Sequence, residues 1–205
     1  MTQHFITDLA TLESHYDQPM LASLAKEIDY LHPHYRAFIN AAPFAVLATS
    51  GPGGLDASPR GDPAGFVAVE DDRTLLIPDR RGNNRLDSLR NIVADPKVAL
   101  LFLIPGVGET LRVNGRAKIS IEPALLERFG IDGQLPRSVV VVHVEAVYFQ
   151  CSRAILRSGL WDPARKIARE TLPSIGTILA DLSKSAIDGP TYDATFEKRV
   201  MTTLY

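Results

Sequence analysis

The chain has 205 residues, of which 45% are hydrophobic and 22% are charged. That hydrophobic content excludes a disordered chain, and the length predicts one domain with an appendage or two small domains. The 22 basic and 24 acidic side chains leave a net charge of −2, which argues against binding to nucleic acid through clustered Lys and Arg.

The longest apolar runs, residues 98–104 and 139–142, are much shorter than the roughly 20 residues that span a bilayer. The sequence therefore predicts no membrane helix. The first residues show no basic stretch followed by an apolar core, so we expect no export signal. Because Cys151 is the only cysteine, no disulfide can form within the chain. We expect a cytoplasmic location.

Residues 1–42 are predicted to form a helical extension. Apolar residues recur there at spacings of three and four between Leu9 and Ile28, and a further helix is expected after Pro33. From Pro43 the pattern changes to short runs typical of β-strands, separated by Gly, Pro and Asp. These strands are predicted at residues 44–49, 55–59, 66–69 and 74–77.

Residues 84–94 interrupt the strands, because their apolar residues share one face of a helix that Asp95 and Pro96 would end. Later predicted elements are strands at 97–104 and 109–119, a short helix at 123–129 and a strand at 138–149. Short strands with one inserted helix favour a small antiparallel barrel over residues 43–150. Residues 151–205 are predicted to form a helical and irregular extension packing on the barrel, with a helix at 174–182 and a polar tail.

The segment from Pro78 to Arg85 is the most informative for function, because it joins a strand end, a glycine turn and a helix start. Asn83 or Asn84 is a natural N-cap for that helix. We expect Gly82 to adopt the left-handed conformation that brings backbone amides close to a ligand. A helix N-terminus also presents unpaired N–H groups and a partial positive charge.

Three arginines, Arg80, Arg81 and Arg85, lie in the same turn. Each costs about 0.3 to 1 kcal/mol near a helix N-terminus, so something negative must compensate. One interpretation is structural, with Asp79 and Asp87 neutralising the arginines. The other is functional, with guanidinium groups and backbone amides converging on the phosphate of a ligand. The turn on its own leaves both interpretations open.

Two further segments place polar side chains on strands. Arg60 leaves a predicted strand into a loop bounded by glycines, where a solvated surface arginine is the alternative to a binding residue. In the strand 109–119, Thr110, Arg112 and Asn114 alternate with apolar residues and therefore share one face. That face is either an ordinary polar exterior or part of a site. His32 and His34 have no third ligand in sequence reach, so no metal site is predicted.

Together these segments resemble the pyridoxamine 5'-phosphate oxidase superfamily of flavin-binding split barrels, over residues 43–150. Within it, the chain is most similar to bacterial FMN-binding proteins related to the oxidase. The resemblance rests on an ordered series of segments: Arg60, Leu75–Pro78, Gly82–Arg85, Asp95–Pro96, Val98–Phe102 and Leu111–Gly115. It implies a six- or seven-stranded antiparallel split β-barrel with flanking helices, an α+β fold that is mainly β.

The resemblance also implies a cofactor, FMN, and the residues that hold it. Arg60, Asn83, Asn84 and Arg85 would bind the phosphate, with Arg80 and Arg81 in the same turn. Ile77 and Pro78 would lie along the flavin ring or the ribityl chain, and Thr110 and Arg112 would reach the cofactor from the barrel edge. Members of this superfamily are homodimers with a flavin in each of two clefts between subunits, so the partner subunit would supply some contacts.

The chain departs from the superfamily pattern in two places. Ile77 and Pro78 replace a tyrosine and a threonine, and Pro78 offers no amide donor. The oxidases' C-terminal arginine–leucine–histidine–aspartate–arginine signature, which grips the pyridoxamine phosphate, has no counterpart after residue 150.

We therefore expect an FMN-dependent oxidoreductase that uses a small-molecule substrate or a nicotinamide donor, and not a true pyridoxamine phosphate oxidase. No side chain is assigned as a catalytic acid or base. A noncatalytic flavin-binding module and a deazaflavin- or haem-binding relative are the alternatives.

Overall fold

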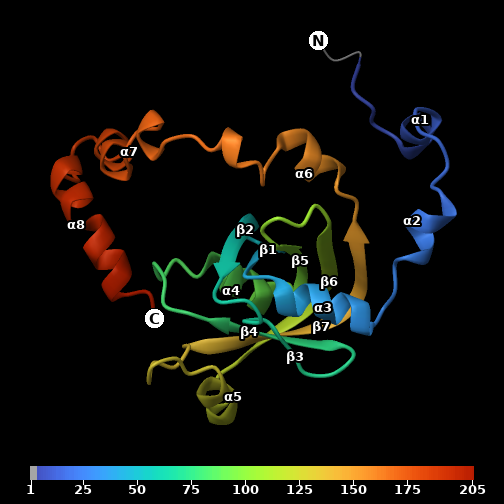
Figure 1. Cartoon of the computed structure of the whole chain (residues 1–205), viewed down its shortest axis with the longest axis horizontal. Coiled ribbons are helices and arrows are strands. Elements are labelled where there is room, and N and C mark those ends of the chain that lie inside the picture. Colours follow the sequence, from blue (N-terminus) through green and yellow to red (C-terminus); the bar gives the residue numbers. More distant parts are fainter. Residues whose placement is uncertain (1–3) are drawn as a thin grey trace.

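Seven antiparallel strands form the centre of the structure, a computed structural model that describes residues 4–205. The strands are β1 (Phe44–Gly51), β2 (Gly54–Gly61), β3 (Ala68–Val69), β4 (Thr74–Asp79), β5 (Lys97–Leu103), β6 (Thr110–Ser120) and β7 (Ser138–Gln150). They pair in the order β2-β1-β5-β6-β7-β4-β3. The sheet curls on itself (Figure 1), which confirms the antiparallel split barrel predicted from the sequence and sets the strand number at seven.

Alternating apolar side chains hold the strands around one core. In β5, Val98, Leu100 and Phe102 are buried, whereas their neighbours in the strand are more exposed. The same alternation in β6 buries Leu111 and Val113. Side chains that point to one face of a strand pack together, and removing them from water supplies the main driving force for folding.

The pairing of β6 with β7 shifts register between Asn114 and Gly115. A Cβ atom at Gly115 would lie 2.0 Å from the backbone oxygen of His143. No side chain fits at that distance, so this irregularity requires glycine. The bend lets the 13 residues of β7 pair with β6 on one side and with β4 on the other.

Three helices lie close to the barrel: α3 (Pro33–Ala41), α4 (Asp87–Ala94) and α5 (Pro123–Arg128). Helix α3 buries Ile39, and α4 packs on β1 and buries Ile92. Helix α4 ends at Ala94 before the predicted Asp95–Pro96 stop. The turn of residues 80–86 joins the end of β4 to the start of α4, and both line one cavity at this corner of the molecule.

The remaining helices lie in two extensions outside the barrel (Figure 1). They are α1 (Leu9–Ser14) and α2 (Leu21–Ala25) at the N-terminal side, and α6 (Arg153–Ser158), two 3-10 turns (Pro163–Arg165 and Arg169–Thr171), α7 (Ile175–Leu182) and α8 (Gly189–Thr202) at the other. Helices α7 and α8 cross where Gly176 meets Gly189, and a Cβ at Gly176 would lie 2.2 Å from the Gly189 carbonyl oxygen.

Four details differ from the sequence prediction. Strand β3 has only Ala68 and Val69, because Phe66 belongs to a turn that its amide closes on Pro63. Ile28 is not helical and instead pairs with Val147 as an isolated bridge. Helix α4 starts at Asp87, three residues later than predicted. The predicted polar tail forms α8, a helix of 14 residues.

None of the helices in the described part of the chain, residues 4–205, has the length and the apolar character needed to cross a membrane. The first three residues of the predicted N-terminal extension lie outside that part.

Candidate functional site

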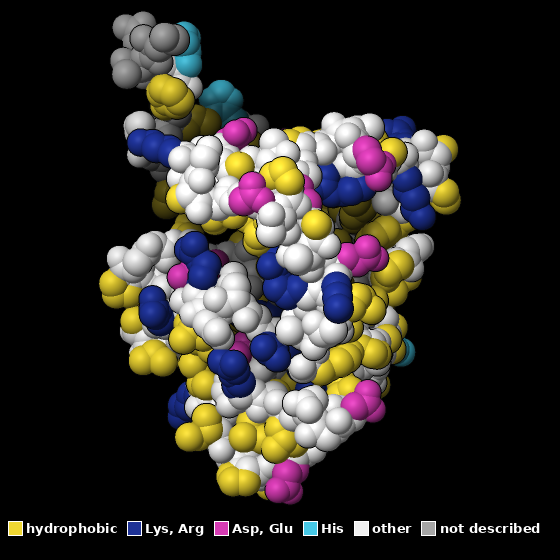
Figure 2. Space-filling model, turned by 90° about the vertical axis from the view of Figure 1, so that its left-hand side faces the viewer, with side chains coloured by type: hydrophobic (Ala, Val, Ile, Leu, Met, Phe, Trp, Pro, Cys, Tyr) yellow, Lys and Arg dark blue, Asp and Glu magenta, His cyan; other side chains and the backbone are white. Residues whose placement is uncertain are grey.

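A cavity of about 800 Å³ lies where the end of β2, the end of β4 and the start of α4 meet. It opens on the side of the molecule seen in Figure 2, where Lys and Arg side chains gather around a hollow. Five arginines and four aspartates line it, which leaves one positive charge in excess. They are Arg60, Arg80, Arg81, Arg85 and Arg137, with Asp56, Asp62, Asp79 and Asp87.

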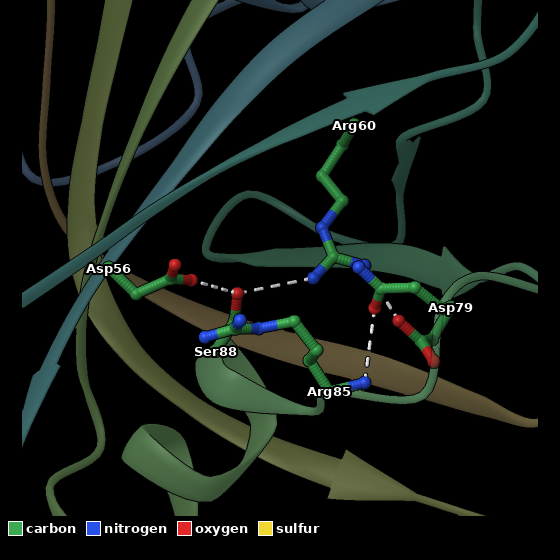
Figure 3. Close-up of polar contacts among 6 residues, drawn as sticks. Asp56, Arg60, Asp79, Arg85 and Ser88 are labelled. Carbon is green, nitrogen blue, oxygen red and sulfur yellow. Dashed lines mark hydrogen bonds and ion pairs between the residues drawn. The ribbon is translucent and has the colours of Figure 1, made fainter. Parts of the chain in front are cut away.

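Arg60 lies at the centre of the cavity wall. Its guanidinium group donates to Asp79 of β4 at 2.6 Å and to the Ser88 hydroxyl of α4 at 3.3 Å (Figure 3). Ser88 in turn donates to the carboxylate of Asp56 in β2. Strands β2 and β4 are far apart in the order of the sheet. Their contact through Arg60 and Asp79 therefore depends on the curling of the barrel.

One donor of Arg60 is left without an acceptor. The side chain is 18% exposed, and its Nε atom is buried with no hydrogen-bond partner among residues 4–205. A buried donor that stays unpaired costs about 1 to 3 kcal/mol. This atom is closed to the cavity, so a ligand there meets Arg60 only through the exposed part of its side chain.

The turn before α4 is built differently from the prediction. Gly82 is not left-handed, and that conformation belongs to Asn84 and Leu86, with φ of 61° and 64°. Neither Asn83 nor Asn84 is the N-cap, because Leu86 occupies that position. Asn83 instead accepts the backbone N–H of Arg85 at 3.0 Å, which closes a local turn through its side chain.

Because of this turn, no side chain caps the N-terminus of α4. The first backbone N–H groups of a helix have no acceptor within the helix and carry a partial positive charge. Such an end binds anions readily when it faces a cavity. Residues Asp87, Ser88 and Leu89, the first three of α4, all line the cavity described above.

The arginines of the turn have separate partners. Arg85 is 74% exposed at its side chain and pairs with Asp87 at 2.7 Å. This hydrogen bond raises the pKa of Arg85, and the nearby negative charge of Asp87 adds to the effect. Arg80 pairs with the buried carboxylate of Asp62 at 2.8 Å. Arg81 makes no ion pair within the described residues.

The structural interpretation of the turn is therefore met only in part. Asp87 neutralises Arg85, as that interpretation predicts, but Asp79 pairs with Arg60 and not with an arginine of the turn. Arg137, which sequence reasoning did not select, donates to Asn84 at 2.8 Å and has no carboxylate partner in the described chain.

Seven of the ten predicted cofactor-binding residues line this one cavity: Arg60, Pro78, Arg80, Arg81, Asn83, Asn84 and Arg85. The other three do not. Ile77 is 2% exposed and belongs to the hydrophobic core. Arg112 lies on β6, where its guanidinium donates to the Tyr148 hydroxyl at 3.0 Å, and Thr110 is two residues away on the same face. Within one chain these three predicted contacts are not formed at the cavity.

The part of the chain that forms most of this cavity matches a known protein family. The sequence profile described as "Pyridoxamine 5'-phosphate oxidase" matches residues 31–151, which is more than half of the chain. This chain belongs to the pyridoxamine 5'-phosphate oxidase family. The matched region contains the whole seven-stranded barrel and all of the cavity except its last two lining residues. No curated protein matches the sequence.

Several solved structures are similar to part of this chain at low identity. HupZ of Group A Streptococcus is 21% identical with a TM-score of 0.48, covering 59% of this chain and 94% of its own. General Stress Protein 26 from Bacillus anthracis is 16% identical with a TM-score of 0.43, covering 56% and 88%. The FAD binding protein from Mycobacterium smegmatis is 15% identical with a TM-score of 0.42, covering 60% and 97%. At these values the matches carry no ligand or activity over to this chain.

The cavity of this family member has one wall from outside the matched region. Leu204 and Tyr205, which follow α8, line it. The Tyr205 hydroxyl donates to Asp62 at 2.7 Å, and the Arg80 guanidinium lies 5.6 Å from the centre of the Tyr205 ring. This hydrogen bond to the carboxylate raises the pKa of Tyr205, and burial adds to the shift. Nothing in the sequence pattern marks a residue after α8 as part of a site formed by β2 and β4.

Two other residues of the site, Ser88 and Asp62, were not predicted from the sequence, for different reasons. Ser88 falls within the predicted helix 84–94, and its place in the first turn of α4 becomes a signal once the true start at Asp87 is known. Asp62 follows Gly61 at the end of β2 and looks like an ordinary turn residue, yet its side chain is only 3% exposed. Among the described residues, no three potential metal ligands lie together.

Proposed function

We propose that this chain binds FMN in the cavity between β2, β4 and α4, with the phosphate against Arg60 and the start of α4. The observation that carries the proposal is the meeting of two donor groups at one place: the Arg60 guanidinium, which lines the cavity, and the uncapped amides of α4. A phosphate dianion offers acceptors to both groups at once.

The side chains around this point fit a phosphate. Arg60 is nearly immobile, since Asp79 and Ser88 fix its guanidinium group. Arg85 is exposed, and its only carboxylate partner in the described chain is Asp87. Such an exposed ion pair contributes about 0 to 1 kcal/mol. Arg85 therefore exchanges Asp87 for a ligand phosphate at little cost, whereas Arg60 keeps its partners and contributes its positive charge.

The aspartates around the cavity reduce its electrostatic attraction for a phosphate. With four carboxylates present, an incoming phosphate meets negative charge as well as the five arginines. Asp79 and Asp62 are already paired, to Arg60 and Arg80. The positive charge without a carboxylate partner comes from Arg81 and Arg137. These two side chains are the ones that attract the phosphate from a distance.

We further propose that the protein is an FMN-dependent oxidoreductase. When bound, a flavin accepts and passes on a hydride or single electrons, so it supplies the redox chemistry. The chain would anchor the phosphate through Arg60, orient the rest of the cofactor along Pro78, and limit access of water from the side of Tyr205. Its substrate is a small molecule or a nicotinamide donor, and we propose that it is not pyridoxamine phosphate.

A homodimer completes this proposal. The cavity of one chain contains the phosphate end of the site, whereas Thr110 and Arg112 lie elsewhere on β6. In a dimer with a cofactor at the subunit interface, the β6 face of one chain would complete the cavity of the other. This accounts for the predicted contacts that a single chain does not make.

The spectrum of the purified protein and one charge reversal test the proposal. We expect the absorption bands of a flavin, at wavelengths that distinguish it from deazaflavin and haem. The variant Arg85→Glu should weaken FMN binding by about 10- to 100-fold, since it replaces a charged donor with a negative group, and should leave the fold intact. Arg73→Glu is the matched control, because Arg73 pairs with Asp29 away from the cavity. Unchanged FMN affinity in Arg85→Glu would show that the phosphate is misplaced.

A further inference from the structure

The N-terminal arm, residues 5–24, exposes large apolar side chains that no residue in the described part of the chain covers. Leu21 is 80% exposed and Phe5 is 74% exposed, and Leu9 and Tyr16 are nearly as exposed. Helices α1 and α2 have six and five residues and bury no side chain. Isolated helices of that length are not stable in water. The arm therefore needs a partner surface to hold its structure.

The arm also carries acidic side chains and no Lys or Arg. The acidic residues are Asp8, Glu13 and Asp17. Asp8 is engaged in capping α1 through the amide of Thr11, whereas Glu13 and Asp17 form no ion pair within the described residues. A surface that fits the arm must therefore be apolar with basic side chains at its edge.

The basic strap, residues 153–172, has these properties. It runs through α6 and the two 3-10 turns and contains five basic and two acidic side chains. Within the described chain no carboxylate pairs with Arg153, Arg157 or Lys166. The strap also exposes four apolar side chains to an extent of at least half: Leu156, Leu160, Ile167 and Leu172. Its charge and its apolar character match those required by the arm.

We propose that the N-terminal arm of one copy of this chain docks on the basic strap of a second copy, and that the second copy returns the same contact. The proposal rests on the homodimer proposed above and adds where its two chains are joined. Reciprocal contacts of this kind give a closed two-fold dimer. The apolar side chains supply the affinity, and Glu13 and Asp17 opposite the strap's cations supply the orientation.

The root of the arm explains why the partner is a second copy and not the same chain. Ile28 and Val147 exchange two backbone hydrogen bonds, of 3.1 and 2.7 Å, which fix the arm to the far end of β7. From that point the arm extends away from the barrel, while the strap crosses the opposite side of the same strand end (Figure 1). Both surfaces consequently remain uncovered within one chain.

A charge exchange between the two surfaces tests the contact. Glu13→Lys with Asp17→Lys, and separately Arg157→Glu with Lys166→Glu, should each weaken the dimer by about tenfold, because attraction becomes repulsion. Combining all four substitutions should restore most of the wild-type affinity. Glu122→Lys with Glu127→Lys, at the N-cap and within α5, makes the same change in net charge as the arm variant but outside both surfaces, and should have no effect. Sedimentation velocity over a range of concentrations gives the dissociation constants.

A cross-link identifies the copy that receives the arm. A photoreactive benzoylphenylalanine at position 16, in a mixture of isotope-labelled and unlabelled chains, should yield cross-linked peptides that join residues 5–24 of one label to residues 153–172 of the other. Arm-to-strap cross-links found only within one label, or cross-links to the barrel, would overturn the docking proposal. If both charge-reversed variants dimerise as the wild type does, the arm proposal fails while the dimer stands. If the wild-type protein sediments as a monomer, the dimer fails as well.

Discussion

The barrel and the two helical extensions are held in place by different means. All residues of the hydrophobic core lie between Leu31 and Val147, within or next to the strands. In the extensions, residues 4–27 and 152–205, the only buried residues are Gly176 and Gly189, which have no side chain to contribute. The barrel therefore carries its own folding energy, and the extensions depend on contacts with something else.

The candidate site lies where these two kinds of structure meet. Arg60, Asp79 and Ser88 belong to the rigid barrel and its helix α4, and they are linked by hydrogen bonds. Tyr205 comes from the weakly held extension, and its known anchors in the chain are Asp62 and Arg80. One wall of the cavity is thus preformed, whereas another can move without cost to the core.

The barrel and the arm should differ most in how much the free energy of unfolding falls when a leucine is truncated to alanine. Leu111→Ala, at a fully buried position in β6, should lower the free energy of unfolding by about 3 kcal/mol. Leu21→Ala, in the exposed arm, should change it by less than about 0.5 kcal/mol when measured at concentrations below dimerisation. Urea unfolding followed by circular dichroism compares the two, and equal losses would contradict the division into a core and dependent extensions.

Removing the partner of Arg60 should have the next largest effect. The pair of Arg60 and Asp79 is mostly buried, at 18% and 12% exposure of the side chains. Asp79→Asn would leave the arginine charge without compensation, at a cost of about 3 kcal/mol in stability. Phosphate or FMN should recover part of that loss, because it supplies the missing negative charge. Asp29→Asn, which breaks the exposed pair with Arg73, is the control and should be nearly silent.

If Asp79→Asn proves as silent as its control, Arg60 is not fixed by Asp79 and the preformed wall does not exist. If the variant is destabilised but gains nothing from phosphate, the cavity wall is real and the phosphate binds elsewhere.

The sequence predicted the barrel well because its strands are marked by local signals. Val98, Leu100 and Phe102 alternate with more exposed residues, and such alternation is a property of neighbours in the chain. Helix α8 was missed because its apolar residues, among them Tyr192, Phe196 and Val200, are sparse among polar and charged neighbours, and because it buries only Gly189. The arm and the strap show apolar residues at helical spacing, yet no pattern reveals that they stay exposed.

The candidate site was predicted in part, because only some of its contacts are local. The turn that carries Arg80 and Arg85 is continuous in sequence and was selected for its charge. The contact between Arg60 and Asp79 joins two strands that are not neighbours in the sheet, so it exists only after the barrel closes. The N-cap was predicted wrongly because the side chain of Asn83 accepts the backbone N–H of Arg85 within its own turn and does not cap the helix.

Removing Tyr205, which forms the movable wall of the cavity, should have a smaller effect, on the affinity for the ligand. Tyr205→Ala removes both the hydrogen bond to Asp62 and the ring beside Arg80. We expect FMN and riboflavin to bind about three- to tenfold more weakly, by the same factor, since losing the exposed hydrogen bond to the Asp62 carboxylate and the ring contact with Arg80 costs about 1 kcal/mol together. Tyr30→Ala, at an exposed position outside both the cavity and the arm, is the control. A loss confined to FMN would place Tyr205 at the phosphate instead of at the wall.

The smallest expected effect is the pH dependence of the cavity wall that Tyr205 forms. The pKa of Tyr205 is raised because its hydroxyl donates to the carboxylate of Asp62. The neutral phenol is thus the form that holds the wall in place. Its contribution is complete below the ordinary tyrosine pKa of about 10 and is lost as the pH rises through the raised value. The difference in absorbance at about 295 nm between wild type and Tyr205→Phe isolates this titration, and Asp62→Asn should return it toward the ordinary range.

A crystal structure of the protein with FMN tests the central claim most directly. The account predicts the phosphate at the first turn of α4, within hydrogen-bond distance of the Arg60 guanidinium, with Arg85 turned from Asp87 toward the phosphate. A flavin bound elsewhere, or a turn that remains empty with Arg60 and Arg85 still held only by Asp79 and Asp87, would contradict it.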